Sequence, residues 1–185
     1  VFVHEVGVRL GAPPGSAILC RLAMASLQFT ERLPQDVFTS VMAGIPHFTT
    51  GIMRNWGRDT FIAAPGILLS THRLPEAREL ILRYAAVARH GLICNLFADG
   101  DAPRFNSRDA TWWWLHVSLV VPNNECVMLY EERATSSSLL QASVAMKFLE
   151  GSPEKTVEEI IQWMLQSLAT GIDFDEWGAP AIDIS

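Results

Sequence analysis

Charged residues are scarce in this chain, and its few cysteines do not cluster. Only 18% of the 185 residues are charged, whereas 49% are hydrophobic. This balance excludes general disorder and predicts a single domain with a buried core. The three cysteines, Cys20, Cys94 and Cys126, form no C-x-x-C pair. A scattered, odd-numbered set indicates a reducing compartment, and we expect a cytoplasmic protein.

Basic clusters and long apolar runs are also missing. Acidic residues outnumber basic ones by 20 to 14, and no basic patch is present, so we do not expect nucleic acid as a partner. The apolar stretch 17–27 is interrupted by Arg21, so we expect no membrane span. The amino terminus lacks the features of a signal peptide, and a start at Val1 suggests a fragment, although processing would do the same.

The sequence has none of the common metal, nucleophile or phosphate motifs. It contains no H-E-x-x-H, no G-x-S-x-G and no phosphate loop. The histidines His47, His72, His90 and His116 do not have the spacing of metal ligands. We therefore expect neither a metal site nor a cofactor.

The sequence contains many signals of α-helices. Apolar periodicity and cap residues predict helices over 17–29, from Asp59 to Leu69 or Ser70, from Pro75 to Gly91, from Ser107 or Arg108 onward, over 137–149, and from Ser152 to Gly171. A short strand within Val1–Val8 is possible, 122–136 is expected to be irregular, and so is the tail 172–185. The fold class is therefore mainly α, with helical hairpins in series. A binding protein built of helical repeats is an alternative, but the sequence has no repeat of fixed period, which weakens it.

The last predicted helix has the clearest boundaries. Ser152 suits the N-cap, Pro153 the first position, and Gly171 the C-terminal end. One face is expected to be buried, formed by Val157, Ile160, Ile161, Met164, Leu165 and Leu168. In the helix from Pro75, Arg89 and His90 are expected in the last turn before Gly91.

The most informative stretch is 51–61, which contains Trp56-Gly57-Arg58-Asp59-Thr60 before an apolar run. The indole of Trp56 could stack on a pyranose ring, and Arg58 and Asp59 could bind neighbouring hydroxyls as donor and acceptor. The alternative is structural. Asp59 would be a helix N-cap, and Arg58 and Asp59 would be a surface pair.

A second polar segment precedes the three consecutive tryptophans. Arg108 and Asp109 are expected at the start of a helix, where they could face the same site. Alternatively, Asp109 is only a first-turn acid with Arg108 as its partner. Trp112, Trp113 and Trp114 cannot all face one way, because successive helical residues lie about 100° apart. One or two should pack in the core, and one could reach a pocket.

These segments, in their order, resemble the amylo-α-1,6-glucosidase region of eukaryotic glycogen debranching enzymes. The similarity is strongest in Gly44–Phe48, Gly51–Ile62, Gly66–Leu69, Glu76–Arg78, Arg89–Ile93 and Arg104–Leu115. The Trp-Gly-Arg-Asp-Thr motif also looks like a sequence motif of glucoamylases in which Arg and Asp bind the terminal glucose. The resemblance divides the chain into a lead-in over 1–46, a best-matching core over 47–121, and the tail.

The resemblance implies part of an (α/α)6 barrel and a glycogen-degrading enzyme. Such an enzyme hydrolyses the α-1,6-linked branch glucose of glycogen limit dextrin, and the parent enzyme also has 4-α-glucanotransferase activity. Trp56, Arg58, Asp59, Arg108 and Asp109 would bind this glucose of a branched α-glucan.

No catalytic residue is identified within the chain. The family's general acid and base would lie in segments that this sequence does not contain. Pro65 and Cys94 also depart from the family pattern, which usually has Arg and Pro there. The alternative function is a non-catalytic helical interaction or glucan-binding module derived from the same scaffold.

Overall fold

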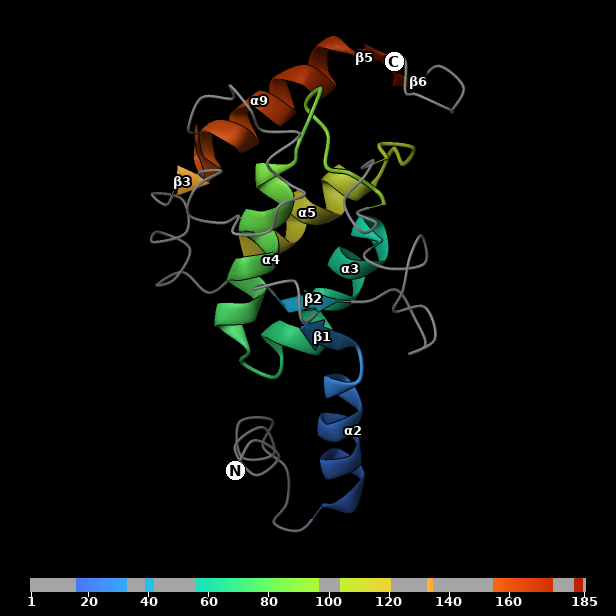
Figure 1. Cartoon of the computed structure of the whole chain (residues 1–185), viewed down its shortest axis with the longest axis vertical. Coiled ribbons are helices and arrows are strands. Elements are labelled where there is room, and N and C mark those ends of the chain that lie inside the picture. Colours follow the sequence, from blue (N-terminus) through green and yellow to red (C-terminus); the bar gives the residue numbers. More distant parts are fainter. Residues whose placement is uncertain are drawn as a thin grey trace.

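Helices dominate the part of the chain described by the structure, a computed structural model. It describes residues 16–32, 39–41, 56–96, 104–120, 133–134, 155–174 and 182–184. The helices are α2 (Ala17–Leu27), α3 (Gly57–Ala64), η3 (a π-helix, Pro65–Leu69), α4 (Leu74–Ala86), α5 (Ala110–Val120) and α9 (Val157–Thr170). The prediction of a mainly α chain is confirmed (Figure 1). The helix expected over 137–149 and the strand expected within Val1–Val8 lie outside the described residues.

Short antiparallel strand pairs accompany the helices. β1 (Thr30–Arg32) pairs with β2 (Thr39–Val41), β3 (Arg133–Ala134) with β4 (Lys155–Thr156), and β5 (Ile172–Phe174) with β6 (Ile182–Ile184). The last pair corrects the expectation of an irregular tail, because Ile172 is paired with Ile184 and Phe174 with Ile182. The pair β3–β4 likewise gives strand structure within 122–136, which was expected to be irregular.

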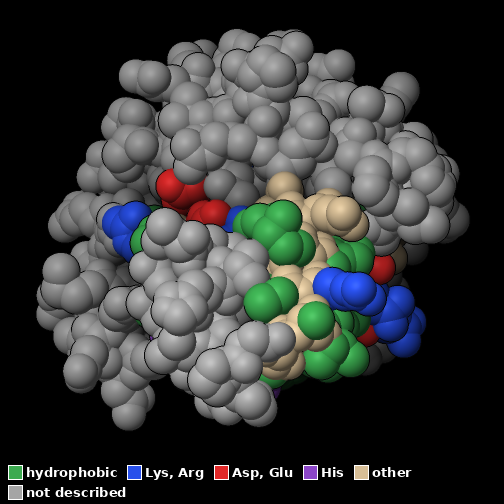
Figure 2. All heavy atoms as spheres, turned by 90° about the horizontal axis from the view of Figure 1, so that it is seen from below, with side chains coloured by type: hydrophobic (Ala, Val, Ile, Leu, Met, Phe, Trp, Pro, Cys, Tyr) green, Lys and Arg blue, Asp and Glu red, His purple; other side chains and the backbone are tan. Residues whose placement is uncertain are grey.

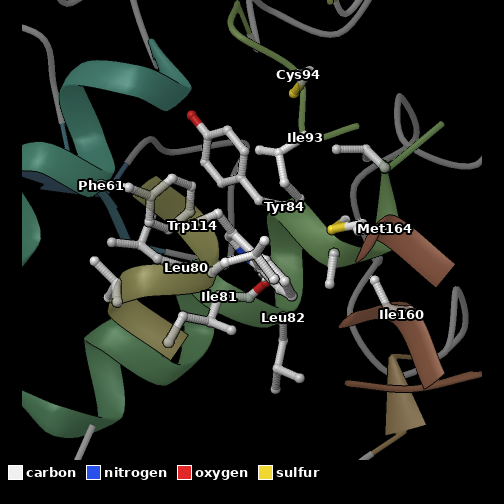
Figure 3. Packing of buried hydrophobic residues seen from close by; sticks show 14 of the residues in the cluster. Phe61, Leu80, Ile81, Leu82, Tyr84, Ile93, Cys94, Trp114, Ile160 and Met164 are labelled. Atoms are coloured by element: carbon white, nitrogen blue, oxygen red, sulfur yellow. Dashed lines mark hydrogen bonds between the residues drawn. The ribbon is translucent and has the colours of Figure 1, made fainter. Parts of the chain in front are cut away.

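The hydrophobic core is built on α4. Leu80, Ile81 and Leu82 are almost completely buried on it, and Trp114 of α5 packs beside them with no exposed surface (Figure 3). The Trp114 indole N–H donates to the carbonyl of Ile81 at 3.1 Å, so this buried polar group is satisfied. Met164 of α9 packs against the same core from another helix. Burying each such side chain contributes about 1.5–3 kcal/mol to stability.

The end of α4 differs from the sequence prediction. The helix ends at Ala86, so Arg89 and His90 do not lie in its last turn. Instead, Arg89 and Leu92 exchange both backbone hydrogen bonds, of 3.1 and 2.7 Å, around a tight turn. His90 and Gly91 have φ angles of 54° and 77°, as in the turns of two-residue hairpins. A Cβ on Gly91 would overlap Ser167 of α9, so the glycine also permits this close packing.

A change of helix type lies at Pro65. The helical segment predicted from Asp59 to Leu69 or Ser70 is present, but it is α-helical only to Ala64. From Pro65 it continues as a π-helix, in which the Ser70 N–H donates to the Pro65 carbonyl at 2.9 Å. Pro65 itself has helical φ and ψ of −57° and −45°. The wider turn accommodates a proline that an uninterrupted α-helix disfavours.

The helix α9 begins later than the sequence predicts. Its N-cap is Thr156, whose hydroxyl accepts from the Glu159 N–H, while the Glu159 carboxylate accepts from the Thr156 N–H. This capping box replaces the cap expected at Ser152, which lies outside the described residues. The C-terminal Gly171 is confirmed, with a φ of 87°. The predicted apolar face is corrected at Leu165, which is 45% exposed.

The helix α2 confirms the prediction over 17–29 but contributes little to the core. It extends away from α3, α4 and α5 (Figure 1), and Ala23 is its one buried residue. Large apolar side chains are exposed along it, namely Ile18, Leu22, Met24 and Leu27. Viewed from the end that α2 forms, apolar side chains lie at the surface (Figure 2). Among the described helices, none is long and apolar enough to cross a membrane.

Candidate functional site

The first turn of α3 is held against the segment that follows α4. The Gly57 N–H donates to the Asn95 carbonyl at 2.6 Å, and the backbone of Trp56 forms a bridge with Leu96. A Cβ on Gly57 would overlap the carbonyl oxygen of Cys94 and press on the Tyr84 ring. Glycine at this position therefore lets the helix start approach the neighbouring backbone closely.

Tyr84 packs against this helix start. Its ring lies edge-on to Phe61, with centroids 4.9 Å apart, between α3 and the segment carrying Cys94 (Figure 3). Desolvation by burial, reinforced by Cys94, raises the pKa of the Tyr84 hydroxyl, although its hydrogen bond with the Thr60 side chain opposes the shift. Tyr84 therefore remains neutral and fixes the helix by packing rather than by charge.

The structure corrects the expected role of Asp59. The helix starts at Gly57 with Trp56 as the N-cap residue, so Asp59 is the third residue of the helix and not its cap. The Trp56 carbonyl accepts the first helical bond from the Thr60 N–H at 2.8 Å. The Asp59 carboxylate is exposed, and a negative charge in the first turn is favoured by the helix dipole.

The start of α5 is organised by Ser107. Its hydroxyl accepts from the Ala110 N–H at 3.3 Å and donates to Asp109 Oδ1 at 2.7 Å. The other carboxylate oxygen, Asp109 Oδ2, accepts from Trp113 Nε1 at 3.3 Å. Both oxygens of Asp109 are thus directed by neighbours on the same helix start.

An ion pair between Arg58 and Asp109 joins α3 to α5. Arg58 Nη2 lies 3.0 Å from Asp109 Oδ2, and these side chains are 54% and 39% exposed. The structure therefore corrects both local pairings that the sequence left open. Arg58 pairs with Asp109 and not with Asp59, and the partner of Asp109 is not Arg108. Two segments far apart in sequence meet at one polar, solvent-accessible site.

The pKa of Asp109 indicates whether its carboxyl group is ionised at neutral pH. Desolvation by burial acts to raise the pKa, but the hydrogen bonds from Ser107 and Trp113 and the charge of Arg58 outweigh it. The net effect is a pKa below the usual value of the carboxyl group. Asp109 is therefore an ionised hydrogen-bond acceptor at neutral pH.

Each of the three consecutive tryptophans has a different environment. Trp114 is fully buried, Trp112 is 52% exposed, and Trp113 is half-buried and bonded to Asp109. Trp113 is therefore the tryptophan of this run at the site, and its ring also meets His116 edge-on at 6.2 Å. The sequence spacing indicates this contact, because residues 109 and 113 are one helical turn apart and their side chains are neighbours.

The other predicted site residues lie nearby without joining the ion pair. Trp56 is half-buried, whereas Asp59 and Arg108 are exposed. Within the described ranges, neither the Asp59 nor the Arg108 side chain forms a hydrogen bond or an ion pair. Among those residues there is also no group of three His, Cys, Asp or Glu side chains that could hold a metal ion.

Sequence reasoning also missed Asn95. Its amide Nδ2 donates to Asn106 Oδ1 at 3.2 Å, and Asn106 immediately precedes Ser107. The Asn95 side chain thus links the segment under α3 to the segment before α5. No local pattern at position 95 marks this role, because its partner is eleven residues away.

Fold and site together define a class of protein. It is a mainly helical protein in which an exposed Arg–Asp pair joins the starts of α3 and α5, and the indole of Trp113 donates to the same aspartate. A guanidinium, a carboxylate and a flat aromatic ring can together bind a neutral, hydroxyl-rich ligand such as a sugar.

The chain belongs to the amylo-alpha-1,6-glucosidase family, whose sequence pattern it matches over residues 24–184. It is also 38% identical over 178 aligned positions to the glycogen debranching enzyme of Saccharomyces cerevisiae. That alignment covers 88% of this chain and 11% of the yeast protein. The chain therefore spans only a small part of the length of this relative.

Proposed function

We propose that this chain is the sugar-binding part of an amylo-α-1,6-glucosidase region in a glycogen debranching enzyme. In this proposal, Arg58 and Asp109 bind hydroxyls of the α-1,6-linked branch glucose of a limit dextrin. Trp113 lies beside the sugar, and Asp59, Arg108 and Trp56 extend the contact around it. The ligand is a branched α-glucan, and the proposal places the protein in the cytoplasm.

The observation that carries the proposal is the ion pair between Arg58 and Asp109, at 3.0 Å. It joins two of the segments that carry the family resemblance, although they lie on different helices. An exposed ion pair contributes only about 0–1 kcal/mol to stability, so stability alone is a weak reason for this arrangement. Its charged groups remain accessible to a ligand, because both side chains are more than a third exposed.

Asp109 is better suited to binding than to proton donation. Glycoside hydrolysis needs one protonated carboxylic acid and one carboxylate, about 6.5–9.5 Å apart in inverting enzymes. The general acid requires a raised pKa, whereas the pKa of Asp109 is lowered. We therefore propose that the acid and the base come from parts of the enzyme outside this chain.

The barrel is likewise a proposal. The contacts between α3 and α5, and between α4 and α9, are those of neighbouring helices that pack around a common core. We propose that these helices form part of an (α/α)6 barrel whose remaining helices lie elsewhere in the debranching enzyme. The helix starts that carry Arg58 and Asp109 would then face its pocket.

A chimaeric enzyme tests this function. The matching segment of the yeast debranching enzyme is replaced by residues 24–184 of this chain, and glucose release from a branched limit dextrin is measured. We expect activity in the chimaera and none in the isolated chain. In the chimaera, Asp59→Asn should lower kcat/KM by about 10- to 100-fold, because a hydrogen bond to a charged group is lost.

Two outcomes would contradict the proposal. Glucose release by the isolated chain, abolished by Asp59→Ala, would show that the acid and base are present here after all. A folded chimaera in which Asp59→Asn and Asp109→Asn leave kcat/KM unchanged would remove both residues from the binding site. The segment would then be a scaffold without contact to the branch glucose.

A further inference from the structure

Asn95 lies where the two segments of the proposed sugar site meet. Its backbone carbonyl accepts from the Gly57 N–H at 2.6 Å, and its own N–H donates to the Arg104 carbonyl at 2.7 Å. The next residue, Leu96, bridges the backbones of Trp56 and Arg104. The backbone at position 95 therefore contacts both the segment leading to Arg58 and the segment leading to Asp109.

The Asn95 side chain adds a second link toward α5. Asn95 Nδ2 donates to Asn106 Oδ1 at 3.2 Å. Asn95 is a buried residue, at 9% exposure, whereas Asn106 is exposed. A buried donor thus holds a surface residue that lies three positions before Asp109.

The other end of the Asn95 amide has no comparable partner in the part of the chain that the structure describes. Its Oδ1 atom is buried and accepts no hydrogen bond from the described residues. An unsatisfied buried acceptor costs free energy, and an apolar residue of similar size would avoid that cost. Among the described residues the amide bonds only through Nδ2, so the bond to Asn106 is the contribution that distinguishes this side chain from an apolar one.

We propose that Asn95 is a positioning residue for the sugar site. It holds Asn106 in place and thereby keeps Asp109 within reach of Arg58 and Trp113. Asn95 itself touches no sugar, since it acts through Asn106 and the turn at Ser107. The inference rests on the proposed function for its consequence in glucan binding, but the positioning itself is measurable without any ligand.

The exposed partner Asn106 offers a matched pair of variants. Asn106→Ala removes the acceptor of the Asn95 amide, whereas Asn106→Asp retains an acceptor oxygen of the same size. Both changes are at an exposed position, so both chains should fold. Asn95→Leu is the complementary change, because it removes the donor together with the unsatisfied oxygen.

The indole N–H of Trp113 reports the position of Asp109 in the free chain. Its nuclear magnetic resonance cross-peak is recorded at neutral pH, with Asp109→Ala as the reference for a lost bond. We expect Asn106→Ala and Asn95→Leu to move the peak toward that reference, and Asn106→Asp to leave it in place. A peak unmoved by both Asn106→Ala and Asn95→Leu, or moved as far by Asn106→Asp as by Asn106→Ala, would overturn the proposal.

Titration with a branched limit dextrin tests the consequence for binding. Asn106→Ala should weaken binding by about ten-fold, the effect of losing one charged hydrogen bond, while Asn106→Asp binds like the unaltered chain. Unchanged binding in Asn106→Ala, despite a moved indole peak, would overturn the role of Asn95 in sugar binding. Failure of the unaltered chain to bind would instead contradict the proposed function, and the indole peak would still decide the positioning role.

Discussion

At the scale of single residues, Gly57 shows most directly how the site depends on close packing. A methyl group on this residue would overlap the Cys94 carbonyl, which is rigid backbone, and press on the Tyr84 ring. We expect Gly57→Ala to lower the free energy of unfolding by about 1–3 kcal/mol, the usual cost of overpacking. Urea unfolding measures this, with Gly66→Ala as the control, because a Cβ on Gly66 meets nothing within 4 Å.

For the control variant, Gly66→Ala, we do not expect a lower free energy of unfolding. Gly66 lies inside the π-helix, where alanine has the higher helix propensity, so Gly66→Ala should leave stability unchanged or raise it slightly. If both substitutions destabilise the chain equally, the start of α3 does not approach Cys94 as the structure shows.

The carboxyl group of Asp109 should make stability depend on pH. Its pKa is lowered in the folded chain, despite desolvation, by Ser107, Trp113 and Arg58. Its stabilising contribution is therefore fully present above the unfolded pKa of about 3.9 and is lost as the pH falls through the lower folded pKa. Since the pair is partly exposed, we expect a contribution of at most about 1 kcal/mol.

The pH dependence is measured against Asp109→Asn, which cannot ionise. Urea midpoints of the two chains should differ most near neutral pH and converge as the pH falls below about 4. A difference that stays constant from neutral to acidic pH would show that the carboxylate has no stabilising partner in the folded chain.

The pairing at the site also shows what single residues in a sequence do not reveal. Arg58 stands beside Asp59 in the sequence, and Arg108 beside Asp109, so local reasoning pairs neighbours. In the structure, Arg58 pairs with Asp109 across two helices. The motifs themselves were predictable, but their partnership depends on how α3 packs on α5, and the sequence shows no periodicity that encodes this packing.

At the scale of helices, apolar periodicity predicted where helices form, whereas the end of α4 and the exposure of some apolar side chains were predicted wrongly or not at all. The helices containing 77–86 and 157–170 were expected from their apolar stripes, and both are present. The end of α4 was placed too late, because Gly91 belongs to a hairpin-like turn and not to a helix C-terminus. The exposed apolar side chains of α2 were equally unforeseen, since periodicity predicts a helix but not which element covers its face.

The junction between α3 and the π-helix allows a test of a whole element. Pro65 has helical backbone angles but lacks the N–H that a helix interior uses. Pro65→Arg should therefore raise the free energy of unfolding, by about 1–3 kcal/mol if the segment returns to regular α-helix. The urea midpoint measures the change. A lower midpoint would show that the π-turn, and the burial of Leu68 that accompanies it, requires the proline.

At the scale of the whole molecule, the described residues combine a helical core with a polar pair, Arg58 and Asp109, for which we propose a role in sugar binding. The core of α4, α5 and α9 supports two helix starts, and their polar residues suit sugar binding more than proton transfer. The family was predictable from the order of motifs along the sequence, and it is shown by the match over residues 24–184. The barrel, and the placement of the catalytic carboxylates elsewhere in the enzyme, are proposals.

The central claim is that Arg58 and Asp109 together bind a branch glucose, and calorimetric titration of this chain with a branched limit dextrin tests it most directly. The unaltered chain should bind saturably, and Arg58→Leu and Asp109→Asn should each weaken binding by about ten-fold or more, while each lowers the free energy of unfolding by at most about 1 kcal/mol. The double variant should bind no more weakly than either single one, because the two groups act as a pair. Equal binding by the unaltered chain and the double variant, or no binding by any of them, would contradict the account.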